Sequence, residues 1–226
     1  MLRRSKTLTC GVNPADLCIL HSDAALIVIE KPAGLPAVPG RPVALHDCVA
    51  SRVQARWPDA LVVHRLDMAT SGLMLMARGA AAQRALSHAF AQRQIEKTYL
   101  AIVAGLLATA PGQWQEIEAP IGTDWPNRPR RIIDPEQGKN AHTHYRLISH
   151  QTAQQTSRVE LKPVTGRTHQ LRLHLQHLGH PILGDTLYAP AAIQTAAKRL
   201  LLHASQLALS HPADGRPMVF NSAAPF

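Results

Sequence analysis

The sequence has few aromatic residues, few cysteines and no long apolar segment. Three Trp, three Tyr and three Phe make up 4% of the 226 residues, too few for an RNA-recognition fold that stacks bases on several aromatic rings. The three cysteines, Cys10, Cys18 and Cys48, are odd in number and far apart, which favours a reducing cytoplasm over a disulfide framework. No window approaches about 18 consecutive apolar residues, so we expect no membrane-spanning helix.

The composition is that of a globular protein with a basic surface. Hydrophobic residues make up 46% and charged residues 17% of the chain without a long biased run. These values exclude a disordered chain, a coiled coil and a collagen-like fibre. The 24 Lys and Arg residues outnumber the 15 Asp and Glu residues, which leaves a formal net charge of +9. This excess indicates a polyanion as the partner class, with a solvated basic surface as the alternative.

The pattern of apolar segments predicts an α/β fold with a mainly antiparallel sheet. We expect residues 1–18 to form a basic N-terminal tail and residues 19–226 to form a single domain. The amphipathic segment 80–93 predicts one helix, and a second is expected to begin at an N-cap Thr168 and to be stopped by Gly179. Short apolar or alternating runs predict strands at 25–30, 61–63, 72–77, 98–103, 158–162 and after 199–204.

Asp67 is the first candidate for chemistry because it lies on a polar turn between two predicted buried strands. It ends the motif His64-Arg65-Leu66-Asp67. A carboxylate at this place needs exposure or a cation, since burying an unpaired charge is costly. The alternative is an aspartate that only caps the turn. A protein-kinase catalytic loop is excluded, because Gly72 stands where the kinase asparagine would follow.

Arg167 is the second candidate and lies in the motif Thr165-Gly166-Arg167-Thr168-His169-Gln170-Leu171-Arg172. The glycine predicts a turn immediately before a helix, so the guanidinium is held on a rigid base. From there it can clasp a carboxylate or a phosphate with two parallel hydrogen bonds. A weak ion pair with a surface acid is the alternative.

The histidines suggest a metal site, but their spacing argues against one. Four histidines between residues 169 and 180 follow one another at spacings of five, three and three residues, which is not a His-Glu-x-x-His pattern. No Cys or carboxylate joins them in the short motif. We therefore expect no metal, and we expect polar or core histidines, some of which contact phosphate. The residues concerned are His169, His174, His177 and His180, with His142 and His144 earlier in the chain.

Two further segments carry reactive or charged side chains. Lys97-Thr98-Tyr99 places a tyrosine at the start of a buried strand, where core packing is the alternative role. Residues 124–131 form a basic loop that prolines interrupt.

These segments together resemble the RluA-type pseudouridine synthases from about Ile19 to the C-terminus. The likeness is carried, in the family's order, by segments 31–34, 64–73, 97–101, 161–172, 179–185 and 201–204. The loop 124–129 and the short length resemble the member that acts on both tRNA and large-subunit rRNA. Larger relatives carry an RNA-binding S4 domain before the catalytic one. Only about twenty residues precede the first predicted strand, so we expect no S4 domain here.

The resemblance implies the pseudouridine synthase fold, a mainly antiparallel mixed sheet with flanking helices and a central catalytic cleft. It also implies the isomerisation of uridine to pseudouridine in RNA. In this reaction the N-glycosidic bond breaks, the base turns over, and a carbon of the base is joined to the same ribose. No electrons or groups enter or leave, so we expect no cofactor.

Site residues follow from their motif positions in the family. Asp67 would be the nucleophile, Arg167 the cation that orients it, and Tyr99 the relay for the proton lost from the base. Substrate contacts are expected from His64, Arg65, Leu202, Arg128, Arg130 and Arg131. Among these the flat guanidinium of Arg65 would fill the space left by the flipped base, and Leu202 would cover the pocket. The three loop arginines would bind phosphates, with a solvated charge run as the alternative.

The expected substrates are the tRNA anticodon stem-loop and a 23S rRNA loop, modified by a monomer in the cytoplasm without a membrane or a metal as partner. Two other classes of function remain open. A non-catalytic RNA-binding or RNA-chaperone protein would fit the charge, but it would not require Asp67, Tyr99 and Arg167 together. A nucleic-acid glycosylase would use an aspartate too, but it usually needs a second carboxylate at the site.

Overall fold

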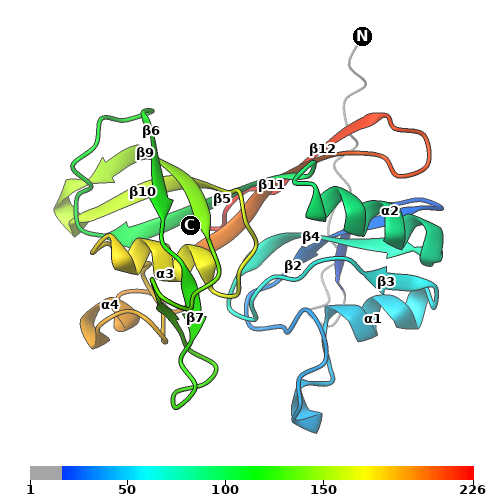
Figure 1. The fold of residues 1–226 in the computed structure, drawn as a ribbon, viewed down its shortest axis with the longest axis horizontal. Helices are drawn as coiled ribbons and strands as arrows, with labels where there is room; N and C mark the ends of the chain where they lie inside the picture. Colours follow the sequence, from blue (N-terminus) through cyan, green and yellow to red (C-terminus); the bar gives the residue numbers. More distant parts are fainter. Residues whose placement is uncertain (1–16) are drawn as a thin grey trace. The chain divides into compact units, whose positions relative to one another are not determined.

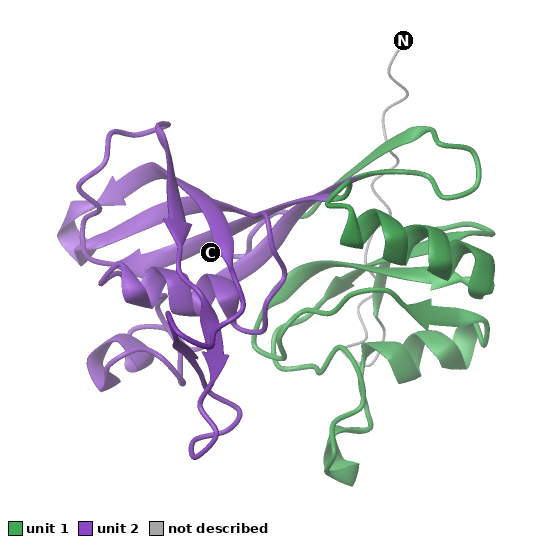
Figure 2. Ribbon diagram, viewed as in Figure 1, with its two compact units in different colours: residues 1–95, 209–222 green, residues 96–208, 223–226 purple. Residues whose placement is uncertain are grey.

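The computed structural model describes residues 17–226. Figure 1 shows their helices and strands, and Figure 2 colours the two units into which they divide. Of the described residues, unit 1 contains 17–95 together with Leu209–Ser222, and unit 2 contains Glu96–Ala208 with Ala223–Phe226. The chain therefore passes three times from one unit to the other. The predicted tail 1–18 lies outside the described residues except for its last two positions, and so does Cys10.

Unit 1 is built on a sheet of buried apolar strands. Strands β1 (Cys18–Ser22), β2 (Leu26–Lys31) and β4 (Ser71–Arg78) pair antiparallel in that order, and β3 (Ala60–Val62) pairs with β4. Both β2 and β4 are buried along most of their length. That burial explains why their sequences are unbroken apolar runs rather than alternating ones. Strand β12 (Pro217–Asn221), which the sequence did not predict, also belongs to this unit.

Two helices pack against β3 and β4 (Figure 1). Helix α1 (Val49–Arg56), preceded by the 3-10 turn η1 (Val43–Leu45), begins at the N-cap Cys48. The Cys48 sulfur accepts a hydrogen bond from the Ser51 backbone, and the Ser51 hydroxyl accepts one from the Cys48 N–H at 3.0 Å. Helix α2 (Gly79–Ala91) lies where the amphipathic pattern predicts it and buries Leu86.

Five strands of unit 2 pair in the order β11-β5-β10-β9-β6, and all these pairings are antiparallel. Their core face includes Leu147, Val159 and Leu161. The strands are β5 (Glu96–Ala104), β6 (Trp114–Glu118), β9 (His142–Gln151), β10 (Thr156–Pro163) and β11 (Leu202–Ser210), whose last two residues belong to unit 1. The 3-10 turn η2 (Thr152–Gln154) joins β9 to β10. The α/β class and the mainly antiparallel sheet predicted from the sequence are confirmed.

Smaller elements complete unit 2. Strands β7 (Ile121–Thr123) and β8 (Arg131–Ile133) form a separate hairpin, and helix α3 (Gln170–His177) packs against β8. Ile121, Leu173 and Tyr188 belong to the small core that forms there. Helix α4 (Ala191–Thr195) follows. None of the helices in residues 17–226 is long and apolar enough to cross a membrane.

The start of α3 differs from the sequence prediction. The N-cap is His169, with φ of +59°, and not Thr168, and the cap position makes no side-chain hydrogen bond. The turn is held instead by the Gln170 side chain, whose Oε1 accepts from the Arg167 N–H at 3.0 Å. The helix ends at His177 and Gly179 follows with φ of +80°, as the sequence predicts.

Candidate active site

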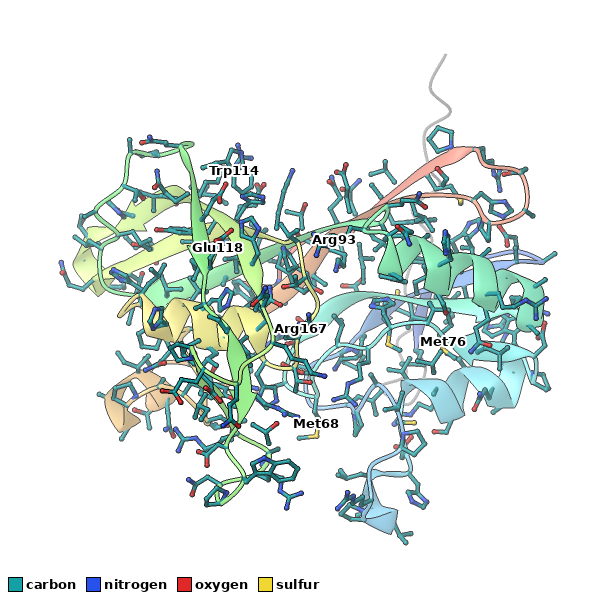
Figure 3. The ribbon with its side chains drawn as sticks, in the orientation of Figure 1. Met68, Met76, Arg93, Trp114, Glu118 and Arg167 are labelled. Carbon is teal, nitrogen blue, oxygen red and sulfur yellow. The ribbon has the colours of Figure 1, made fainter. Side chains whose placement is uncertain are left out.

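Asp67 lies on the turn that connects β3 to β4 in unit 1. The side chains on both sides of it are anchored, since Leu66 is 6% and Thr70 2% exposed, and the Thr70 N–H donates to the Asp67 carbonyl at 3.1 Å. Asp67 itself is half-buried, and Met68 beside it, labelled in Figure 3, is exposed. The turn therefore has fixed ends and an accessible centre.

A buried lysine ties this turn to a second loop. Lys31, at the end of β2, is 0% exposed, and its ammonium group donates to the backbone carbonyls of Pro32, Leu35 and Met68 at 2.8, 2.7 and 3.0 Å. The Met68 carbonyl also accepts from the Gly34 N–H at 2.8 Å. Gly34 has φ of +88°, a conformation that favours glycine. The loop after β2 thus holds the residue that follows Asp67.

The two residues at the start of the Asp67 motif differ in their surroundings. The Nε2 atom of His64 accepts a hydrogen bond from the Leu75 N–H at 2.9 Å, and its ring lies 4.7 Å from that of Phe90. His64 therefore fastens the turn to β4, and its predicted substrate contact stays a prediction. Arg65 is exposed, as a residue that replaces a flipped base has to be.

Tyr99 and Leu202 lie on neighbouring strands of unit 2. Tyr99, on β5, is 9% exposed and stands opposite Ala204 of β11, while Leu202 is 3% exposed. Lys97 precedes Tyr99 on the same face of β5, and burial lowers the pKa of its ammonium group. Both predicted site residues thus contribute to the packing of this sheet.

Arg167 is exposed on a turn that buried hydrogen bonds hold in place. Its Nε donates to the Asn140 carbonyl at 3.1 Å. The buried Gln170 accepts from the Thr165 hydroxyl at 2.7 Å, and its amide nitrogen donates to the His142 carbonyl at 2.9 Å and to the Thr143 hydroxyl at 3.0 Å. The sequence predicts a rigid turn beneath Arg167, and these hydrogen bonds make the turn rigid.

The three arginines of the basic loop have unequal freedom. Arg128 is exposed and lies over the ring of Trp125, with its Cζ 4.5 Å from the ring centroid. Arg130 is exposed too, 5.8 Å from the Tyr188 ring centroid. Arg131 is half-buried on β8, where its guanidinium donates to the Thr123 hydroxyl and its N–H donates to the Tyr188 hydroxyl. The first two can reach a phosphate more readily than the third.

The predicted residues divide between the two units. Asp67, His64 and Arg65 belong to unit 1. Unit 2 contains Tyr99, Arg167, Leu202, Arg128, Arg130 and Arg131. The contacts described above lie within one unit or the other, and the pairing of Asp67 with Arg167 stays a prediction.

Sequence reasoning missed two residues that position this machinery, Lys31 and Gln170. Both stand inside the motifs 31–34 and 161–172, where only the turn and the arginine received a role. A lysine at the end of a buried strand followed by Pro and Gly signals an ammonium group that needs carbonyl partners. Gln170 gave no comparable signal, because the acceptors of its amide nitrogen lie on a strand 27 and 28 residues earlier.

Comparison with known proteins agrees with these motifs. Residues 25–177 match the family model for RNA pseudouridylate synthase. The chain belongs to the RNA pseudouridylate synthase family. It is therefore an isomerase that acts on uridine in RNA, as the sequence resemblance implied. The matched segment contains Asp67, Tyr99 and Arg167.

Named members of this family are similar along nearly the whole chain. The dual-specificity RNA pseudouridine synthase RluA of Escherichia coli K12 is 46% identical over 210 residues, which cover 93% of this chain and 94% of that protein. The enzyme of the same name from Yersinia pestis is 47% identical, with 93% and 100% covered.

Solved structures of RNA pseudouridylate synthase proteins share the fold. Human RNA Pseudouridylate Synthase Domain Containing 1 superposes with a TM-score of 0.77 at 28% identity, over 97% of this chain and 87% of that one. Human RNA Pseudouridylate Synthase Domain Containing 4 gives a TM-score of 0.71 at 27% identity, over 92% and 88%. The fold class predicted from the sequence is confirmed by both.

Proposed function

We propose that this enzyme converts uridine to pseudouridine in two kinds of RNA loop, the tRNA anticodon stem-loop and a loop of 23S rRNA. The observation that supports this most is the 46% identity, over 93% of the chain, with an enzyme named for dual specificity. The basic loop 124–131 also supports an RNA substrate, because its two exposed arginines can bind a polyanion. Loops are favoured targets, since flipping a base costs less where stacking is already weak.

In the proposed reaction the Asp67 carboxylate is the nucleophile. It is consumed and restored within one turnover, so atoms and charge balance without a cofactor: the C1′–N1 bond breaks, a C1′–C5 bond forms, and the C5 proton is released while N1 gains one. A carboxylate suits this role because it attacks while ionised and can leave again. The Lys31 hydrogen bond to the neighbouring Met68 carbonyl supports a fixed position for Asp67.

Arg167 and Tyr99 would complete the chemistry. A guanidinium beside Asp67 would orient the carboxylate and keep it charged. The Tyr99 ring would lie against uracil while its hydroxyl relays the C5 proton. Because Asp67 belongs to unit 1 and the other two residues to unit 2, we propose that residues 19–226 act as one catalytic domain. We place this domain, as a monomer, in the cytoplasm.

RNA binding would be distributed over other residues. Arg65 would take the place of the flipped base, His64 would contact the substrate at the same turn, and Leu202 would cover the pocket. Phosphate contacts would come mainly from Arg128 and Arg130. Arg131 would contribute less, because its guanidinium already binds the Thr123 hydroxyl.

The test uses an unmodified anticodon stem-loop RNA and protein without added cofactor or metal. We expect a uridine isomer of unchanged mass, detected by nuclease digestion and chromatography. Free uracil would identify a glycosylase, and unchanged RNA would identify a binding protein. Asp67→Asn should lose the isomer while RNA affinity stays within about two-fold, because the phosphate contacts lie elsewhere. Asp47→Asn, an exposed aspartate of the same unit, is the matched control. Turnover by the Asp67 variant would contradict the assignment.

A further inference from the structure

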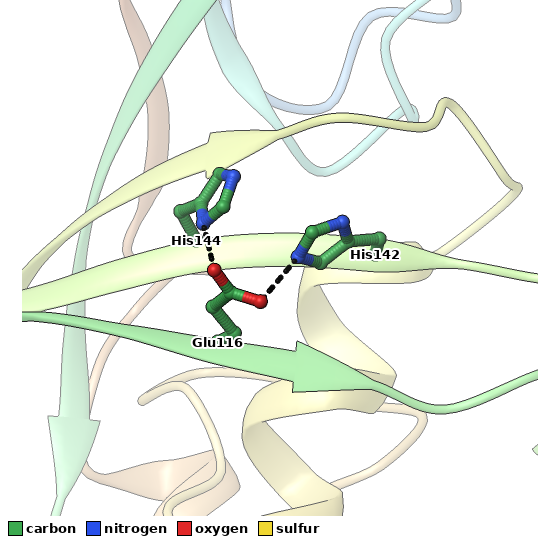
Figure 4. A group of neighbouring side chains, drawn as sticks. All are labelled: Glu116, His142 and His144. Atoms are coloured by element: carbon green, nitrogen blue, oxygen red, sulfur yellow. Dashed lines mark hydrogen bonds and ion pairs between the residues drawn. The ribbon is translucent and has the colours of Figure 1, made fainter.

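The outer face of the unit 2 sheet carries a cluster that the reaction does not use. Its members are Glu116 on β6 and His142 and His144 on β9 (Figure 4). Glu118 of β6 lies beside His142. Strand pairing creates the cluster, because Glu116 stands opposite His144 and Glu118 opposite His142. Residues two apart on a strand point to the same side, so both histidines face both carboxylates. The edge-strand residues Trp114 and Glu118 are labelled in Figure 3.

The distances in this cluster suit a metal ion. The Glu116 carboxylate lies 3.2 Å from His142 Nε2 and 3.4 Å from His144 Nδ1. Two ligands of a tetrahedral Zn²⁺ at about 2.1 Å are about 3.4 Å from each other. One ligand atom from each of the three residues lies within 4.8 Å of the others. The remaining gap can close by side-chain rotation, because the histidines are 25% and 35% exposed.

Glu118 provides the support that metal-binding histidines usually have. Its carboxylate lies 3.8 Å from His142 Nδ1, on the ring nitrogen that does not face Glu116. A carboxylate at that nitrogen fixes the orientation of the ring and raises its basicity. Two carboxylates also balance a dication locally, although the whole chain is basic. Lys162 stands beside His144 on β10, but its ammonium group lies over the Trp114 ring.

We propose that Glu116, His142 and His144 bind a divalent transition-metal cation, with Zn²⁺ as the preferred ion. Imidazole nitrogens and a carboxylate oxygen are ligands that Zn²⁺ accepts, and a fourth position stays open for water. The site is separate from the catalytic tyrosine. Tyr99 stands opposite Leu161, which stands opposite Tyr145, whereas His144 points to the other side of the same sheet. The bound ion would fasten β6, at the edge of the sheet, to β9.

The experiment measures Zn²⁺ binding to the untagged, chelator-treated full chain by isothermal titration in a buffer that does not bind metal. We expect one strong site per chain. Glu116→Gln and His144→Gln should each weaken binding at least about 100-fold, and Glu118→Gln about 10–100-fold as an outer partner. His177→Ala removes an exposed histidine outside the cluster and is the matched control. Unfolding of each variant without metal checks that it is folded.

A second readout does not depend on calorimetry. Zn²⁺ should raise the thermal unfolding midpoint of the wild-type protein and of the His177 variant, but not that of the His144 variant. An ion stabilises the folded state only of a protein that binds it. The proposal would be overturned if the wild type had no strong Zn²⁺ site. It would also be overturned if the Glu116 and His144 variants bound Zn²⁺ as tightly as the wild type. Neither outcome bears on isomerase activity, so the proposed function is tested separately.

Discussion

Replacing Lys31 by methionine tests whether the loop after β2 holds the turn that carries Asp67. The ammonium group donates three hydrogen bonds of 2.7–3.0 Å to backbone carbonyls, one of them the carbonyl of Met68 next to Asp67. Methionine is unbranched and of similar length, so it leaves little cavity. The change therefore removes the hydrogen bonds more than the packing.

The expected loss of stability follows from those three bonds. A hydrogen bond to a charged group contributes about 1.5–3 kcal/mol, and leaving a buried acceptor unpaired costs a similar amount. Methionine also avoids the cost of burying an ammonium group, and the Met68 carbonyl keeps its bond from the Gly34 N–H. We expect a net loss of about 2–4 kcal/mol in the free energy of unfolding. A turn displaced by about 1 Å would lower kcat about 10–100-fold.

Urea unfolding gives the first quantity, and single-turnover kinetics on an anticodon stem-loop gives the second. RNA affinity should stay unchanged, because Lys31 is buried and does not contact substrate. Lys198→Met, at an exposed position, should change neither quantity. If the Lys31 variant unfolds within about 0.5 kcal/mol of the wild type and keeps its kcat, the three bonds do not hold the turn.

Three further predictions concern other parts of the molecule. Arg128→Ala should weaken RNA binding and lower the slope of log affinity against log salt by about one, measured by fluorescence anisotropy; an unchanged slope would place this arginine in solvent. Asp185→Asn leaves the guanidinium of Arg172 buried without its carboxylate partner, at present 2.5–2.8 Å away. This change should lower the free energy of unfolding, measured in urea, by about 3–5 kcal/mol, and a loss below about 1 kcal/mol would refute the reasoning. Burial lowers the pKa of His174 to about 4. As the pH decreases, this histidine therefore takes up its proton in the unfolded chain before it does so in the folded one. The free energy of unfolding present above about pH 6.5 should fall by roughly 2–3 kcal/mol as the pH decreases toward 4. His174→Gln should flatten that part of the profile, and an equal slope in both proteins would exclude this histidine as the cause.

The sequence predicted well those strands whose residues form an unbroken apolar run. Strands β2 and β4 are such runs, and both lie where expected. Strand β9 was missed because its inner face includes Thr143 and Tyr145 and its outer face is His142, His144 and Arg146, so neither face looks apolar. Helix α1 was missed too, since its cap is a cysteine rather than the usual Ser, Thr, Asp or Asn.

The candidate site was predictable only as far as local motifs reach. The turn that carries Asp67 follows from the two buried strands around it. The hydrogen bond from Lys31 to the Met68 carbonyl joins residues 37 positions apart, and Glu116 contacts His142 across 26 positions. Histidine spacing along one segment cannot detect a carboxylate that strand pairing supplies. Contacts of this kind depend on the tertiary fold and not on any one stretch of sequence.

The return of the chain to unit 1 near its end has a consequence for synthesis on the ribosome. His211 lies 3.2 Å from the Asp23 carboxylate, and the Ser222 hydroxyl donates to Glu30 at 2.8 Å. Strands β1 and β2 therefore emerge from the exit tunnel long before these partners have been translated. Unit 1, which bears the proposed nucleophile Asp67, is therefore completed only when Leu209–Ser222 have been made, and a premature stop codon after residue 208 would damage it while sparing most of unit 2.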